Sequence, residues 1–167
     1  LITQLFGDRM YIANATGCSS IWGGSAPSTP YTKNKDGKGP AWANSLFEDN
    51  AEYGYGMFLA QNTIRKRTIA KVLELSKTTK AKDLKAACEE YLSTIDCGKT
   101  NSPATDALIA ALKKSKTKAS EEILKDADYL RKKSMWIFGG DGWAYDIGFS
   151  GLDHVLAQGE DVNIFVF

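Results

Sequence analysis

The stretch MWIFGGDGWAYDIG, residues 135–148, passes from a continuous apolar run to glycines, an aspartate and an aromatic-rich segment. A short apolar run bounded by a glycine turn is typical of a buried strand. The next segment, residues 143–159, has helical character, and DVNIFVF, residues 161–167, is a second buried run. This order predicts a βαβ unit with parallel strands and a right-handed crossover.

The glycine turn also suggests a ligand. Gly139, Gly140 and Gly142 allow the backbone to turn tightly and to present N–H groups, and the helix that follows points its positive end at the same place. Both features favour an anion such as a phosphate. A carboxylate beside a phosphate needs a cation between them, so Asp141 predicts a shared Mg²⁺ ion. The spacing is not that of the GxGxxG dinucleotide pattern. The alternative is that Asp141 only caps the helix.

Three segments together resemble the thiamine diphosphate domain of the pyruvate:ferredoxin (flavodoxin) oxidoreductase family. They are LFGDRMYIANATGCSSIWGGSAPSTPY, GPAWANSLFEDNAEYGYGM and WIFGGDGWAYDIGFSGLDHVLAQGEDVNIFVF, and they cover about half of the chain. Ser150 stands where the family usually has glycine. The second half of the family's metal motif follows the next strand, which we expect beyond Phe167. The chain is therefore expected to be a fragment, part of one thiamine diphosphate-binding domain of a larger enzyme, with an α/β fold and a mainly parallel central sheet flanked by helices.

The resemblance implies an enzyme that converts pyruvate and coenzyme A to acetyl-CoA and carbon dioxide, and passes electrons through 4Fe-4S clusters to ferredoxin or flavodoxin. It implies that Gly140, Asp141, Gly142 and Trp143 form the diphosphate turn, with Asp141 as a Mg²⁺ ligand. Cys18, in ATGCSS, matches a ligand of the cluster nearest the thiamine. Since such a cluster needs four ligands, the other three are expected outside this chain.

Other interpretations stay open. The chain could come from a pyruvate:NADP oxidoreductase, in which the same core is fused to a flavin module, or from a relative that acts on another 2-oxo acid. A non-catalytic module that uses residues 77–118 as a partner surface is the alternative of a different class. The full-length enzyme is expected to be a homodimer in the cytoplasm, or in a hydrogenosome-like organelle of an anaerobic protist. The fragment alone is expected to be inactive.

Composition is that of a globular protein, with 43% hydrophobic and 25% charged residues and a net charge of +1. Most of the 21 Lys and Arg lie between Arg65 and Lys133 among acidic residues, which indicates a solvated helical face rather than a nucleic-acid interface. No apolar run approaches the roughly 18 residues that a membrane span needs. We therefore expect neither nucleic acid nor membrane as a partner.

The remaining reactive side chains are expected to have ordinary roles. Cys88 and Cys97 fit small buried hydrophobes, and three cysteines without a CxxC spacing do not predict a disulfide framework. His154, the only histidine, is expected to be packed or hydrogen-bonded on its helix rather than catalytic. Surface or packing roles are expected for Asp146 and Asp153, and packing, with a place in the thiamine pocket as the alternative, for Trp22, Tyr31 and Trp42.

The rest of the chain is predicted by pattern. A buried strand should end near Ala13, followed by a turn with Thr16, Cys18 and Ser19, and residues 23–44 should form a long loop. Residues 45–76 predict one long helix or two in tandem, with Gly54 and Gly56 read as tolerated helix glycines or points of close approach. A helical insertion should fill about residues 65–133, with a variable part at 77–118, a break near residues 96–103 and a last helix that begins at a Ser120 cap.

Overall fold

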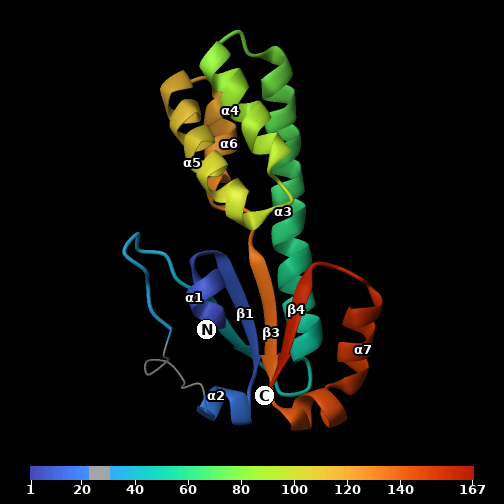
Figure 1. Cartoon of the computed structure of the whole chain (residues 1–167). Helices are drawn as coiled ribbons and strands as arrows, with labels where there is room; N and C mark the ends of the chain where they lie inside the picture. Colours follow the sequence, from blue (N-terminus) through green and yellow to red (C-terminus); the bar gives the residue numbers. More distant parts are fainter. Residues whose placement is uncertain (23–30) are drawn as a thin grey trace. The chain divides into compact units, whose positions relative to one another are not determined.

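The computed structural model describes residues 1–22 and 31–167. The chain divides into two compact units (Figure 1). The α/β unit consists of Leu1–Leu59 and Ser134–Phe167, and the helical unit consists of Ala60–Lys133. The helical unit corresponds to the insertion expected at about residues 65–133. That the chain forms part of one domain of a larger enzyme stays a prediction.

The α/β unit contains a four-stranded sheet in the order β2-β1-β3-β4, and all of its neighbouring strands are parallel. The strands are β1 Met10–Ala15, β2 Ala41–Ser45, β3 Ser134–Gly139 and β4 Val162–Val166. Its helical segments are α1 Ile2–Phe6, the 3₁₀ turn η1 Gly7–Arg9, α2 Cys18–Trp22, the π-helical turn η3 Trp143–Ile147, α7 Phe149–Ala157, and the start of α3 Asn50–Thr78. The expected mainly parallel α/β sheet and its β3-helix-β4 unit are confirmed.

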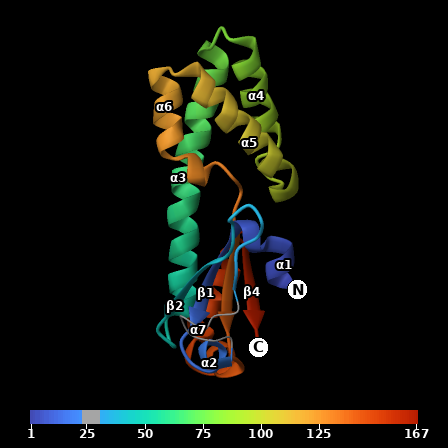
Figure 2. The same cartoon turned by 90° about the vertical axis from the view of Figure 1, so that its left-hand side faces the viewer.

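Helices cover both faces of this sheet, as a parallel sheet requires. Figure 2 shows α1 and the beginning of α3 on opposite sides of the strands. On one face, Trp143, Leu152 and Val155 pack with Ala51 of α3 and Ile137 of β3. On the other face, the partly buried Ile2 and Phe6 of α1 pack against a cluster of buried strand residues, Met10, Ile12 and Phe138. Strands β1 and β3 therefore lie at the centre of the unit.

Strand β2 corrects the prediction of a continuous loop over residues 23–44. Residues 31–40 are irregular, but Ala41–Ser45 pairs with Tyr11–Ala15 of β1 in parallel register. Residues 23–30 of the predicted loop lie outside the described residues. Strand β1 also runs two positions past its predicted end, to Ala15.

Helix α3 is one continuous helix rather than a tandem pair, and it begins at Asn50 rather than at residue 45. The two glycines in its first half differ. A Cβ atom built on Gly54 would lie 2.5 Å from Cγ1 of Ile137 and 3.1 Å from Cβ of Ala13, whereas one on Gly56 would meet nothing within 4 Å. Gly54 is thus a point of close approach between α3 and the sheet, and Gly56 is a tolerated helix glycine.

The helical unit packs the second part of α3 with three further helices. They are α4 Lys82–Ser93, α5 Gly98–Ser115 and α6 Lys118–Lys125, followed by a 3₁₀ turn η2 at Ala127–Tyr129. Its core contains buried side chains from every one of the four helices, among them Val72, Tyr91, Leu108, Leu112 and Ile123. The break near residues 96–103 is confirmed only in part, because α5 already begins at Gly98.

The last helix of this unit begins earlier than predicted. Thr117, not Ser120, is the N-cap, and its side chain accepts a hydrogen bond from the Ser120 backbone N–H. Ser120 itself is buried, and its hydroxyl contacts that of Thr117 at 2.9 Å. The helix also ends at Lys125, so Arg131, Lys132 and Lys133 lie beyond it.

Charge is divided unevenly between the two units. Acidic residues outnumber basic ones in the α/β unit, and basic residues outnumber acidic ones in the helical unit. Among the described residues, no helix combines the length and the apolar character that crossing a membrane requires.

Candidate functional site

The direction of the strand order reverses between β1 and β3. From β1 the chain goes to β2 on one side, whereas β3 and β4 lie on the other side. In open parallel sheets, ligands bind beyond the strand ends at such a reversal of strand order. The turns that follow β1 and β3 are therefore the place to look for a site.

The turn after β1 carries Cys18. Gly17 has a φ of +150°, and α2 begins at the next residue. The hydroxyl groups of Ser19 and Ser20 donate to the carbonyls of Ala15, at 3.1 Å, and Gly17, at 2.8 Å. These bonds hold the turn, while the thiol of Cys18 stays exposed.

The turn after β3 carries the glycines and Asp141. The first helical hydrogen bond runs from Ala144 N–H to the Gly140 carbonyl at 3.1 Å. The backbone N–H groups of Asp141, Gly142 and Trp143 precede that bond, so they have no partner within their own helix. Gly140 and Gly142 thus lie where the backbone can approach a ligand.

Gly139 has a different reason to be glycine. A Cβ atom on it would lie 2.2 Å from Cε3 of Trp143, and one on Gly148 would lie 2.4 Å from Cδ1 of the same ring. Trp143 is completely buried in the core. Its indole therefore occupies the space over both glycines, and only its backbone faces the turn.

The two turns meet. A Cβ atom built on Gly140 would lie 3.7 Å from Cβ of Cys18. The ring of Phe47, in the segment after β2, approaches both turns, because Cβ atoms on Gly17 and Gly142 would lie 3.1 and 3.6 Å from it. Cys18 and the glycine turn, far apart in the sequence, are neighbours in the fold, and Phe47 is a third member that the sequence did not point to individually.

The side chain of Asp141 is exposed, and it has no hydrogen bond or ion pair with any residue that the structure describes. The alternative role as a helix cap therefore receives no support from its contacts. An unpartnered carboxylate beside glycine backbone N–H groups fits one half of a Mg²⁺–diphosphate site. Within residues 1–22 and 31–167, no cluster of three or more His, Cys, Asp or Glu side chains could hold a metal alone.

Asn50 is a second residue that sequence reasoning missed. It is the first residue of α3, it is fully buried, and its side chain hydrogen-bonds the backbone of β1 and β3. It lies within the segment GPAWANSLFEDNAEYGYGM, which carries part of the family resemblance, but nothing in the pattern distinguishes Asn50 from an ordinary helix-start residue.

The other candidates lie away from the two turns or in the core. His154 is exposed on α7, and its Nε2 is 3.4 Å from Nε2 of Gln158, the residue that follows the helix, as expected for a hydrogen-bonded residue. Asp146 and Asp153 are exposed. Tyr31 and Trp42 are partly buried and pack against the cluster around Met10 and Ile12, whereas the side chain of Trp22 lies outside the described residues.

The two cysteines of the helical unit differ from each other. Cys88 is buried, and burial raises the pKa of its thiol to about 11, as expected for an inert core residue. Cys97 is exposed, so its prediction as a buried hydrophobe is wrong. A hydrogen bond from the Thr100 side chain, with those from the Thr100 and Lys99 backbone, lowers the pKa of Cys97 to about 7. The break before α5 leaves this thiol in solvent.

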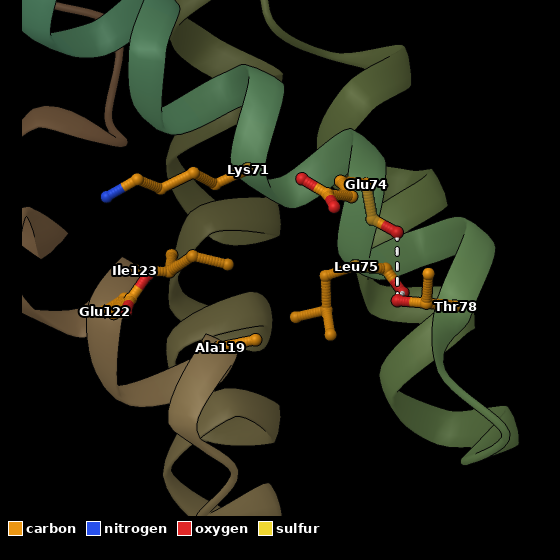
Figure 3. Close-up of a pocket in the computed structure, with 7 residues that line it drawn as sticks. All are labelled: Lys71, Glu74, Leu75, Thr78, Ala119, Glu122 and Ile123. Atoms are coloured by element: carbon orange, nitrogen blue, oxygen red, sulfur yellow. Dashed lines mark hydrogen bonds between the residues drawn. The ribbon is translucent and has the colours of Figure 1, made fainter.

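A hollow in the helical unit lies between α3 and α6 (Figure 3). Its lining mixes exposed charged side chains with the edge of the core, and the hydrogen bond drawn there, from Thr78 Oγ1 to the Glu74 carbonyl at 3.1 Å, lies within α3. It is lined by Lys71, Glu74, Leu75, Thr78, Ala119, Glu122 and Ile123. The polar groups that line this hollow do not converge on one point, so the turns after β1 and β3 remain the better candidate for the functional site.

Known proteins similar to the chain are named as oxidoreductases that act on pyruvate. The pyruvate-flavodoxin oxidoreductase of Klebsiella pneumoniae is 54% identical over the whole chain, and the pyruvate:ferredoxin oxidoreductase of Moorella thermoacetica is 54% identical over 99% of it. The chain is homologous to a segment of the pyruvate:ferredoxin (flavodoxin) oxidoreductases. It spans only 14% and 15% of the length of these two relatives.

The similarity extends beyond the ferredoxin and flavodoxin enzymes of this family. The mitochondrial pyruvate dehydrogenase (NADP⁺) of Euglena gracilis is 48% identical over 99% of the chain, which spans 9% of that protein. No protein-family profile matches the chain. By name, all three relatives are oxidoreductases that act on pyruvate.

Proposed function

We propose that the protein to which this chain belongs oxidises pyruvate with coenzyme A to acetyl-CoA and carbon dioxide, and passes two electrons to ferredoxin or flavodoxin. The observation that carries the proposal is the meeting of Cys18 with the Gly140–Gly142 turn, in a chain about half identical to enzymes of that name. Fold and sequence similarity thus support the same site.

In this proposal the chain supplies part of a thiamine diphosphate site. Thiamine diphosphate bound there would supply the carbanion chemistry that cleaves a 2-oxo acid beside its keto group. Gly140 and Gly142 let the backbone N–H groups approach the diphosphate, and the Asp141 carboxylate binds the Mg²⁺ that neutralises it. The buried ring of Trp143 packs against the backbone of Gly139 at the start of the turn. The remaining Mg²⁺ ligands would come from outside the chain.

Cys18 is proposed as one ligand of a 4Fe-4S cluster next to the thiamine. Its exposed thiol lies beside Gly140, so a cluster bound there would adjoin the diphosphate turn. Three further thiolates are needed. Such proximity would allow electrons to leave the substrate singly, which one-electron carriers require.

A pyruvate:NADP oxidoreductase is the second candidate, supported by the Euglena gracilis relative. The proposed chemistry at pyruvate is the same, and only the module that receives the electrons differs. A non-catalytic role is disfavoured, because the relatives that match almost the whole chain are named as enzymes. A homodimeric enzyme in an anaerobic cytoplasm or organelle remains part of the proposal.

The test is Asp141→Ala in the intact enzyme, with Mg²⁺-dependent binding of thiamine diphosphate measured by calorimetry. The affinity should fall by more than the roughly 10–100-fold that loss of an outer-shell partner costs, because a direct ligand is removed. Asp153→Ala is the matched control, since it removes an exposed carboxylate on α7 and should leave the affinity unchanged. Equal affinity of Asp141→Ala and the wild type would refute the role of Asp141.

A further inference from the structure

Asn50 joins three strands of the sheet through one side chain. Its Nδ2 donates to the Phe138 carbonyl of β3 at 2.9 Å and to the Ala13 carbonyl of β1 at 3.4 Å. Its Oδ1 accepts from the hydroxyl of Ser45, the last residue of β2, at 2.7 Å. An amide has two N–H donors and one carbonyl acceptor, so this arrangement uses both of its ends.

The hydrogen bonds of Asn50 contact the three strands near their carboxyl ends, next to the candidate site. Phe138 pairs with Asn14 in the β1–β3 ladder, and the turn with Gly140 and Asp141 begins two residues after it. On β1, the turn with Cys18 begins shortly after Ala13. Asn50 therefore bridges the two strands at their carboxyl ends, just before the chain leaves each of them for its turn.

Through Ser45, Asn50 is also linked to the segment that carries Phe47. Phe47, whose ring approaches Gly17 and Gly142, follows Ser45 by two residues. A buried amide with every bond satisfied holds its partners in one arrangement, and loss of its donor leaves two carbonyls without that partner. A shift at Asn50 is thus transmitted to both turns and to Phe47 together.

We propose that Asn50 is a positioning residue, which sets the separation between the Cys18 turn and the Asp141 turn by joining the carboxyl ends of β1, β2 and β3. This inference rests on the proposed function, because it gives those two turns a cofactor and a cluster to position. The side chain of Asn50 is fully buried. It acts through the backbone of Ala13 and Phe138.

The experiment uses the intact enzyme with Asn50→Asp and two companion variants. Asn50→Asp keeps the shape of the side chain but replaces the N–H donors with an oxygen facing two carbonyls. Ser45→Ala leaves the Asn50 amide intact and removes the hydroxyl that donates to its Oδ1, together with that hydroxyl's contacts with the carbonyls of Leu46, at 2.9 Å, and Asn14, at 3.5 Å. Asn44→Ala is the control: its exposed side chain accepts from Asn14 Nδ2 at 2.9 Å, and Asn14 keeps its bond to the Ala15 carbonyl.

Three quantities are measured: the Kd for thiamine diphosphate with Mg²⁺, the electron paramagnetic resonance spectrum of the reduced clusters, and the melting temperature. Asn50→Asp should weaken thiamine diphosphate binding at least about tenfold and change the spectrum of one cluster, because both turns move. Ser45→Ala should produce a smaller change in the same two readouts. Asn44→Ala should change neither the Kd nor the spectrum.

The outcomes separate this inference from the function on which it rests. A wild-type enzyme that binds no thiamine diphosphate refutes the proposed function. If the wild type binds and a folded Asn50→Asp enzyme shows a lower melting temperature with unchanged Kd and spectrum, Asn50 is merely structural and the inference is overturned. If Asn50→Asp fails to fold, Ser45→Ala decides, and an unchanged Kd and spectrum in that variant overturn it equally.

Discussion

Cys18 has the two properties that a cluster ligand at this site needs: its thiol is exposed, and it lies beside the glycine turn. Cys18→Ser in the intact enzyme should abolish or alter the electron paramagnetic resonance signal of one 4Fe-4S cluster and leave the others intact. The reason is that such clusters are held by thiolates, which a serine hydroxyl does not replace.

Cys97→Ser is the matched control for that prediction. Cys97 is also exposed, and hydrogen bonds from Thr100 and Lys99 lower the pKa of its thiol to about 7, but it lies in the helical unit. Its replacement should leave every cluster signal unchanged. An unaltered set of signals in the Cys18→Ser enzyme would remove Cys18 from the cluster.

Some residues of the candidate site could be predicted from the sequence, and others could not. The resemblance implied that Cys18 and Gly140 belong to one site. The structure brings them together because β1 and β3 are adjacent parallel strands that end at the same edge of the sheet. Asn50 escaped prediction because its carbonyl partners lie 37 and 88 residues away, and an asparagine at a helix start suggests only a cap. Gly139 was assigned to the ligand, but the buried ring of Trp143 is the neighbour that excludes a side chain there.

Helix α3 offers a matched pair of substitutions two positions apart. Gly54→Ala should lower the free energy of unfolding by about 1–3 kcal/mol, because the added methyl group meets the buried side chain of Ile137. Gly56→Ala should raise it by up to about 1 kcal/mol, because the methyl group meets open space and the helix loses a glycine. Urea unfolding of the two variants measures both changes, and effects of the same sign would contradict the packing of α3 on the sheet.

Elements with a strong hydrophobic pattern were predictable, and elements without one were not. Strands β1, β3 and β4 are apolar runs. The helix between β3 and β4 predicted that these two strands are parallel, whereas the mainly parallel sheet as a whole came from the family resemblance. Strand β2, AWANS, has one large apolar residue, Trp42, among small and polar ones, and none of its residues is fully buried. Only its pairing with β1 makes it a strand, and a pattern of single residues does not contain that information.

The chain as it stands should not turn over pyruvate. It spans 14–15% of its ferredoxin and flavodoxin relatives, and it offers one of the four thiolates that a cluster needs. With pyruvate, coenzyme A, thiamine diphosphate and Mg²⁺, the 167-residue chain should reduce methyl viologen no faster than buffer, whereas the intact enzyme should reduce it readily. Turnover by the chain alone would show that the missing ligands are dispensable.

The uneven division of charge between the two units has a consequence for handling the protein. A net charge of +1 suggests a protein that binds only weakly to ion-exchange resins. Retention depends on local charge at the surface that meets the resin, not on the sum. Because one unit is acidic and the other basic, the same chain should be retained at low salt by anion-exchange and by cation-exchange columns, so its isoelectric point is a poor guide to its purification.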